Sequence, residues 1–178
     1  HAAYPYGEKK EDWLINRCQT LVSIMQNKQR YQAIIIACNT ASTLVLPSLR
    51  ANTSTPIIGV VPAIKTASEL SSNKRIGLLA TPGTVSRQYM NELINEFAQN
   101  CQTTRVGSTD LVYLAEDKLH GKTVDTEQLA SITKPFIDAQ CDYVVLGCTH
   151  FPLLKDELKF ISNQINWIDS GDAIANRA

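Results

Sequence analysis

Two cysteines end apolar runs of the same kind, and their positions in the chain suit acid/base chemistry. The run IIIA at 34–37 leads into Cys38, and the run VVLG at 144–147 leads into Cys148. A polar pair follows each cysteine: Asn39 and Thr40 after the first, Thr149 and His150 after the second. Two copies of one pattern indicate a single site assembled from two similar halves.

A single cysteine at the end of an apolar strand is most often a small buried hydrophobe, but its repetition favours function. Moving a proton between the two faces of a carbon needs a base on one side and an acid on the other. A thiol can serve as either, because its ordinary pKa of about 8.5 lies close to neutrality. Two thiolates would repel each other, so the resting pair is expected to share one proton.

The other three cysteines, Cys18, Cys101 and Cys141, have no such setting. Cys18 falls within a predicted helix, Cys101 in a polar loop and Cys141 ahead of a predicted strand. We therefore expect structural or incidental roles for all three. Five cysteines without a regular spacing favour reduced thiols over a disulfide framework. There is no CxxC or HxxxH spacing, so no metal site is expected, and nothing in the sequence calls for a cofactor.

Apolar, β-branched runs alternate with longer amphipathic segments, which predicts a parallel α/β sheet. The predicted strands are 33–38, 57–61, 76–80, 104–107, 143–147 and 166–169. The predicted helices are 8–29, 40–50, 63–70, 84–99, 111–119, 126–139, 153–162 and 171–177. In such sheets ligands bind beyond the carboxyl ends of the strands, where helix N-termini favour a thiolate. We expect Cys38 and Cys148 at this edge.

Two breaks in the pattern predict two similar α/β lobes, each a mostly parallel sheet flanked by helices. Pro62 follows the GVV run, and DSG occupies 169–171. We therefore expect one lobe to contain residues 1–61 plus 170–178, and the other residues 62–169. The active site is expected in the cleft between them.

The charge balance argues against nucleic acid or a membrane as a partner. Lys plus Arg is 17 and Asp plus Glu is 17, so no field of one sign exists to attract a polyanion. No apolar run approaches the roughly 20 residues that cross a bilayer, and no basic-then-apolar leader opens the sequence. We expect a cytoplasmic protein.

Six segments together resemble glutamate racemases of the aspartate/glutamate racemase family. They are YPYGEK at 4–9, ACNTAS at 37–42, PIIGVVPA at 56–63, GLLATPGTV at 77–85, LGCTHFPLL at 146–154 and IDSGDAIA at 168–175. The His-Phe-Pro continuation at 150–152 favours glutamate racemase, because aspartate racemases usually place a glutamate after the CT pair. The resemblance covers nearly the whole chain. The family's opening strand, with its own DSG motif, lies before the matched region, so a longer protein is expected.

The resemblance implies a cofactor-independent interconversion of L- and D-glutamate, which supplies D-glutamate for peptidoglycan, cell wall biogenesis and cell shape. It implies that Cys38 and Cys148 are the acid and base and that His150 orients the neighbouring thiol or assists proton transfer. The implied substrate-binding residues are Tyr6, Gly7, Asn39, Thr40, Thr81, Thr84 and Thr149. Glutamate is the implied small-molecule partner, and a homodimer is left open.

Several of these residues also have ordinary structural explanations. The PYG at 5–7 is typical of a turn. His150 and the Thr81–Thr84 segment are typical of helix caps. Glu116 falls where the family carries an acidic residue near its pocket, but a lone glutamate within a helix is expected to be solvent-exposed. Another two-thiol racemase, acting on aspartate or a hydantoin, and a non-catalytic binding or regulatory relative remain alternative functions.

Overall fold

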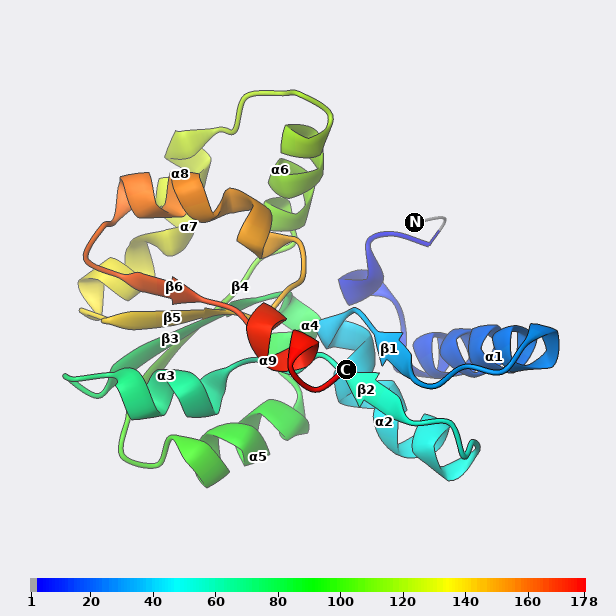
Figure 1. Cartoon of the computed structure of the whole chain (residues 1–178). Helices are drawn as coiled ribbons and strands as arrows, with labels where there is room; N and C mark the ends of the chain where they lie inside the picture. The colour runs from blue at the N-terminus through cyan, green and yellow to red at the C-terminus, as the bar shows by residue number, and fades with distance from the viewer. Residues whose placement is uncertain (1–2) are drawn as a thin grey trace. The chain divides into compact units, whose positions relative to one another are not determined.

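A computed structural model describes residues 3–178 (Figure 1). The chain divides into two compact units. One unit runs to Val61 and resumes at Ser170–Ala178, and we call it the Cys38 unit. The other, Pro62–Asp169, is the Cys148 unit. Both are parallel sheets with flanking helices, so the predicted fold class is confirmed.

The Cys38 unit is built on two parallel strands, β1 (Ile34–Ile36) and β2 (Ile57–Gly59), with Ile34 opposite Ile57. Its helices are η1 (Tyr6–Glu8), α1 (Glu11–Lys28), α2 (Asn39–Ala51) and α9 (Gly171–Ala175). The buried side chains of α1, α2 and the strands form one apolar cluster, which includes Val22, Val45 and Leu49. A hydrogen bond from Gln19 Nε2 to Ser48 Oγ at 2.5 Å ties α1 to α2.

The Cys148 unit holds a four-stranded parallel sheet in the order β4-β3-β5-β6. The strands are β3 (Arg75–Ala80), β4 (Gln102–Gly107), β5 (Tyr143–Leu146) and β6 (Asn166–Ile168). The helices are α3 (Ile64–Leu70), α4 (Pro82–Val85), α5 (Gln88–Phe97), α6 (Asp110–Leu119), α7 (Thr126–Asp138), the 3₁₀ turn η2 (Phe151–Leu154) and α8 (Lys155–Ile161).

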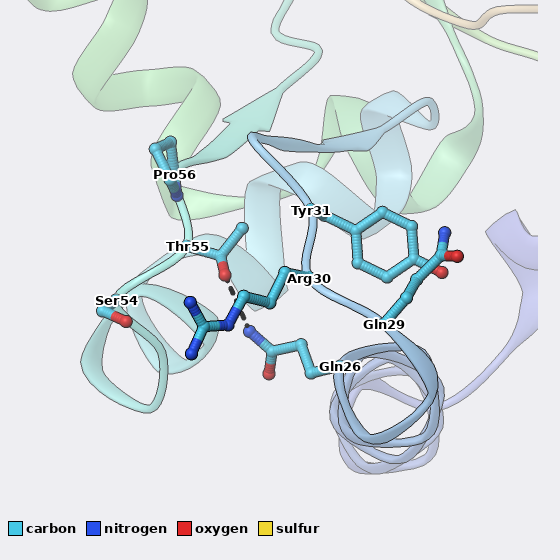
Figure 2. A pocket seen from close by; sticks show the side chains of 7 residues that line it. All are labelled: Gln26, Gln29, Arg30, Tyr31, Ser54, Thr55 and Pro56. Carbon is cyan, nitrogen blue, oxygen red and sulfur yellow. Dashed lines mark hydrogen bonds between the residues drawn. The ribbon is translucent and has the colours of Figure 1, made fainter.

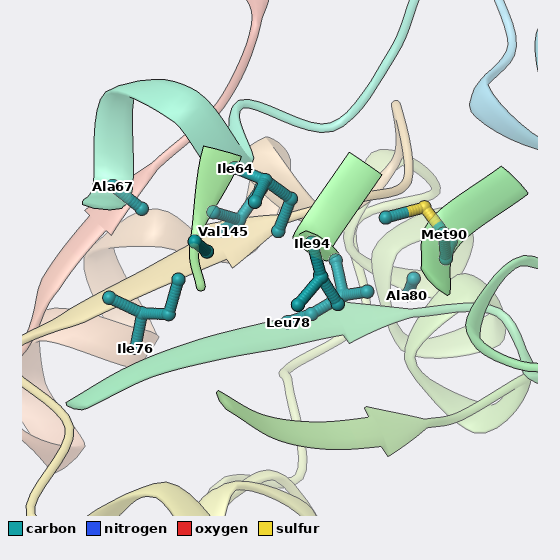
Figure 3. Packing of buried hydrophobic residues seen from close by; sticks show 9 residues of the cluster. Ile64, Ala67, Ile76, Leu78, Ala80, Met90, Ile94 and Val145 are labelled. Carbon is teal, nitrogen blue, oxygen red and sulfur yellow. The ribbon is translucent and has the colours of Figure 1, made fainter. Parts of the chain in front are cut away.

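The central strand β3 is buried on both faces, because alternate residues point to opposite layers of helices. Figure 3 shows Ile76, Leu78 and Ala80 packed with residues of α3 and α5. On the other face, Gly77 lies against the ring of Phe136 from α7. That ring also meets Trp167 of β6 edge-on, with ring centroids 6.3 Å apart. The two layers hold the strand ends at fixed positions.

All six predicted strands are present, but two predicted helices differ from the structure. The segment predicted as one helix over 84–99 forms α4 and α5, because Arg87 is extended (φ −71°, ψ 145°) and begins a new helix. The segment predicted over 153–162 starts as the 3₁₀ turn η2 before α8. Pro152 stands at the start of η2, where its missing N–H costs no hydrogen bond.

Over residues 3–178, no helix has the length and apolar character that crossing a membrane requires.

Candidate active site

Cys38 lies at the carboxyl end of β1 and caps the first turn of α2. Its backbone is extended (φ −155°, ψ 120°), and its Sγ accepts a hydrogen bond from the Ala41 N–H at 3.4 Å. The side chain is half-buried. The sulfur therefore sits where the partial positive charge of a helix N-terminus favours its anionic form, as the sequence predicted.

The Ser42 hydroxyl holds the chain around Cys38, a role that the sequence analysis missed. It donates to the Ile36 carbonyl at 3.0 Å and accepts from the Val60 N–H at 3.0 Å. Ser42 is 1% exposed, so these two bonds join the ends of β1 and β2 inside the unit. The sequence signal for this role is the serine of the ACNTAS motif. Nothing in that motif indicates that Val60, which follows β2, is its partner.

Asn39 and Thr40 follow Cys38 and are both buried. Within residues 3–178, no group hydrogen-bonds to the Asn39 Oδ1 atom, although Asn39 is only 3% exposed. A buried amide oxygen without a partner is costly, which suits an acceptor reserved for a ligand donor. Tyr6 and Gly7 belong to η1, and η1 lies against α2 in the same unit.

Cys148 lies beyond the carboxyl end of β5 and contacts an imidazole. Its Sγ is 3.8 Å from His150 Nδ1, and His150 Nε2 is 2.7 Å from Glu116 Oε1 on α6. A carboxylate only accepts hydrogen bonds, so Nε2 carries a proton and the Nδ1 position faces the sulfur. Carboxylate, imidazole and thiol thus form a chain of three groups along which a proton can be held or moved.

The expectation of an exposed Glu116 is wrong. Its side chain is 18% exposed and that of His150 is 16% exposed, because α6 packs against η2. The two residues are separated by 34 positions in the chain, so no local pattern links them. Only the family resemblance placed an acidic residue in this region.

The expectation that a helix N-terminus follows Cys148 also needs correction. The next helical element is the short 3₁₀ turn η2, which starts at Phe151 with His150 as its N-cap. A single 3₁₀ turn aligns few peptide dipoles, so His150 rather than a helix dipole is the main polar neighbour of this sulfur. The two cysteine environments therefore differ.

Three predicted threonines also lie beyond strand ends of the Cys148 unit. Thr81 follows β3 and is buried with Thr84, and their hydroxyl oxygens lie 3.0 Å apart. Since β3 pairs with β5 in parallel, Thr81 and Cys148 share one edge of the sheet. Thr149 is exposed beside Cys148.

All five cysteines carry free thiols. The pKa of Cys18 is raised by burial and by the nearby charge of Cys38, while Arg17 lowers it. Burial also raises the pKa of Cys141, against a lowering hydrogen bond from Thr104. Both thiols are therefore poor acid/base groups near neutrality, which agrees with the incidental roles expected of them.

A cavity of about 450 Å³ in the Cys38 unit lies away from the predicted site residues (Figure 2). It opens near Tyr31 and Pro56, ahead of β1 and β2, whereas Cys38 follows β1. Its lining is Gln26, Gln29, Arg30, Tyr31, Ser54, Thr55 and Pro56. Across the part of the chain that the structure describes, no group of three or more His, Cys, Asp or Glu side chains could hold a metal ion.

Comparison with known proteins identifies the family of this chain. The family model described as Asp/Glu/Hydantoin racemase matches residues 3–178. The chain belongs to this racemase family. Glutamate racemase from Vibrio cholerae is 54% identical over 178 residues, which cover 99% of this chain and 66% of that protein. Glutamate racemase from Shewanella sp. (strain MR-7) is 49% identical over 99% of this chain and 65% of that protein.

A solved structure shows the same fold as this racemase-family chain. Escherichia coli glutamate racemase, crystallised with L-glutamate and the activator UDP-MurNAc-ala, matches with a TM-score of 0.92 and 47% identity. The match covers 98% of this chain and 67% of that one. The chain thus spans slightly under two thirds of the length of the two curated relatives above.

Proposed function

We propose that the protein carrying this chain is a glutamate racemase that interconverts L- and D-glutamate without a cofactor. The observation that carries the proposal is the pair of strand-ending cysteines, Cys38 and Cys148, in a chain about half identical to glutamate racemases. A non-catalytic relative has no need for a thiol, imidazole and carboxylate in series, so the Cys148–His150–Glu116 contacts favour an active enzyme.

In the proposed reaction, one cysteine thiolate removes the α-proton and the thiol of the other returns a proton to the opposite face. The C–H bond breaks as an S–H bond forms, and the second S–H bond breaks as the new C–H bond forms. Each turnover exchanges the protonation states of the two sulfurs, and either the reverse reaction or proton exchange with solvent restores them. By resemblance, Cys38 acts on D-glutamate and Cys148 on L-glutamate.

His150 serves Cys148 as a partner for its proton, and Glu116 holds the imidazole in orientation. The 2.7 Å contact between His150 Nε2 and Glu116 Oε1 supports this division of roles. Replacing Glu116 by Gln keeps the side-chain size but removes the charge that fixes the imidazole proton. We expect the Glu116→Gln variant to lose about tenfold to a hundredfold in kcat.

The remaining residues are proposed to bind the substrate. The unpartnered Asn39 Oδ1 accepts from the α-ammonium, and the hydroxyls of Thr40 and Thr149 bind the α-carboxylate. Tyr6 and Gly7 contribute to the side-chain carboxylate site, and Thr81 and Thr84 line it. The His-Phe-Pro continuation after Cys148 and Thr149 supports glutamate over aspartate as the substrate.

The cellular role follows from the product. D-glutamate is a component of bacterial peptidoglycan, so we propose a role in cell wall biogenesis. Two free thiols must persist for catalysis, which agrees with the reducing conditions of the cytoplasm.

Single cysteine variants of the full-length protein test the mechanism. Cys38→Ala and Cys148→Ala should each abolish net racemisation, measured by circular dichroism, because one face of the carbon loses its proton-transfer group. In heavy water, the Cys148→Ala protein should still exchange the α-proton of D-glutamate slowly with retention of configuration, read by NMR. Cys101→Ala provides the matched control and should racemise at the wild-type rate. A folded Cys148→Ala protein with near wild-type racemisation would eliminate the two-thiol mechanism.

A further inference from the structure

We propose that Lys118 is a positioning residue for the Cys148 half of the reaction, an inference that rests on the proposed racemase function. Lys118 extends from α6, the helix that also carries Glu116. Its Nζ donates to the Leu153 carbonyl at 2.7 Å and to Glu157 Oε2 at 2.9 Å. Leu153 belongs to η2 and Glu157 to α8, so one ammonium group joins three elements.

Lys118 contacts the same segment of the chain that carries His150. Leu153 N donates to the His150 carbonyl at 3.1 Å, and η2 begins directly after His150. The Lys118 contact and the Glu116–His150 contact therefore both connect α6 to this short turn. A displacement of the turn relative to α6 would lengthen both.

The two contacts leave α6 from different sides. Successive helical residues are about 100° apart, so positions 116 and 118 point roughly 200° apart around the axis. The buried side chains of α6 already pack this helix against the core, so the two contacts act on the position of the turn rather than on the rotation of the helix. Lys118 thus helps to hold the turn at the position where His150 meets Glu116.

The Lys118–Glu157 pair is partly buried, which distinguishes it from the surface pairs of the same region. Its side chains are 33% and 21% exposed, against 66% and 48% for the neighbouring Lys122–Asp117 pair. Exposed pairs contribute little because water screens them, whereas a sheltered charge-assisted pair keeps its geometry. Lys122 offers a matched control, since its Nζ contacts Asp117 of α6 itself rather than η2 or α8.

The turn has an apolar anchor that does not depend on Lys118. Phe151 and Leu154 of η2 are fully buried. Loss of the ammonium should therefore loosen the turn without unfolding the unit. The expected effect is a misplaced imidazole rather than a lost fold.

The test compares Lys118→Met, Lys118→Arg and the control Lys122→Met in the full-length protein. Methionine keeps an apolar stem and removes the ammonium, and arginine restores a charged donor. We expect Lys118→Met to lower kcat by about tenfold with KM little changed, because small misplacements of a catalytic group are costly. Lys118→Arg should recover most of the activity, and Lys122→Met should match the wild type.

A second readout does not depend on racemase activity. The side-chain ¹⁵N signals of His150, assigned with a His150→Gln variant, report which ring nitrogen carries the proton. In the wild type and Lys122→Met we expect the proton at Nε2, facing Glu116. In Lys118→Met we expect a mixture of the two tautomers, because the Glu116 contact is no longer held.

The outcomes separate the two proposals. A wild-type protein without racemase activity refutes the proposed function, and the tautomer measurement then still decides the role of Lys118. If Lys118→Met does not fold, Glu157→Gln removes the negative charge of one of the two acceptors and should give a smaller loss of kcat in the same direction. Wild-type kcat together with an unchanged Nε2 proton, in Lys118→Met or in Glu157→Gln, would overturn the inference.

Discussion

Asp142 precedes β5 and binds the loop that leads into β3. Its carboxylate accepts from Ser71 Oγ at 2.6 Å, from the Ser72 N–H at 2.7 Å and Oγ at 3.0 Å, and from the Asn73 N–H at 3.2 Å. The cluster lies at the amino-terminal edge of the sheet, and Cys148 lies beyond the carboxyl end of the same strand. We predict that Asp142→Asn destabilises the Cys148 unit and leaves kcat unchanged.

The expected loss of stability in Asp142→Asn follows from the number of hydrogen bonds to the carboxylate and from their exposure to water. A hydrogen bond to a charged group contributes about 1.5–3 kcal/mol, and asparagine can satisfy only some of these four donors. Three of the four bonds are exposed, so water replaces part of what is lost. We therefore expect a loss of about 2 kcal/mol in the free energy of unfolding. Asp138, in an exposed i,i+4 pair with Lys134, is the matched control, and Asp138→Asn should cost about 0.5 kcal/mol or less.

The pH dependence has a defined sign. Burial raises the pKa of Asp142, but the hydrogen bonds from Ser71, Asn73 and Ser72 together outweigh it and lower the pKa in the folded protein. A carboxylate with a lowered pKa contributes stability above its unfolded pKa of about 3.9, and that stability is lost as pH falls through the folded value. The difference between wild type and Asp142→Asn should be constant near neutrality and shrink below about pH 4.

Urea unfolding followed by tryptophan fluorescence measures this difference. Trp167 of β6 is 5% exposed and reports on the Cys148 unit, whereas Trp13 lies on α1 in the other unit. A Trp13→Phe background isolates the Trp167 signal, since the two units need not unfold together. Equal stability of Asp142→Asn and wild type at neutral pH, or a difference that persists unchanged at low pH, would refute the reasoning.

Two further predictions concern packing and thiol chemistry. Gly77→Ala places a Cβ 2.5 Å from Phe136 Cδ1 and 2.7 Å from Val144 Cγ2. It should lower the free energy of unfolding by about 1–3 kcal/mol in the same urea assay. An unchanged unfolding midpoint would contradict the packing argument. Cys38→Ser removes a charge that raises the pKa of Cys18. Cys18 should then be alkylated faster by iodoacetamide at a fixed alkaline pH, measured by peptide mass spectrometry, and an unchanged rate would show that the charge of Cys38 does not control this thiol.

Most of the fold could be predicted from the sequence because each strand is a short, buried, β-branched run between amphipathic segments. The central strand shows this best, since β3 matches its predicted range to within one residue. The helix over 84–99 was mispredicted because no residue there forbids a helix. The break at Arg87 depends on how α4 and α5 pack separately onto the sheet, which is a tertiary effect.

The candidate site was predictable where its chemistry is local and unpredictable where it spans the chain. Cys38, Asn39 and Thr40 are adjacent, and a strand followed by a helix suffices to place them at the sheet edge. The sequence alone predicts a solvent-exposed Glu116, because nothing near an isolated helical glutamate indicates a distant partner. Its contact with His150 arises from the packing of α6 on η2, which periodicity does not encode.

The same packing makes the two cysteines chemically unequal, although their sequence motifs look alike. The Cys38 sulfur accepts from the Ala41 backbone N–H, a donor that does not titrate. The Cys148 sulfur faces the imidazole of His150, which is itself held by the Glu116 carboxylate. The contacts of Cys148 therefore offer a route along which a proton can be passed to a second side chain. If both thiols work on one substrate, one face of its α-carbon is served by a thiol at a helix N-terminus and the other by a thiol, imidazole and carboxylate in series.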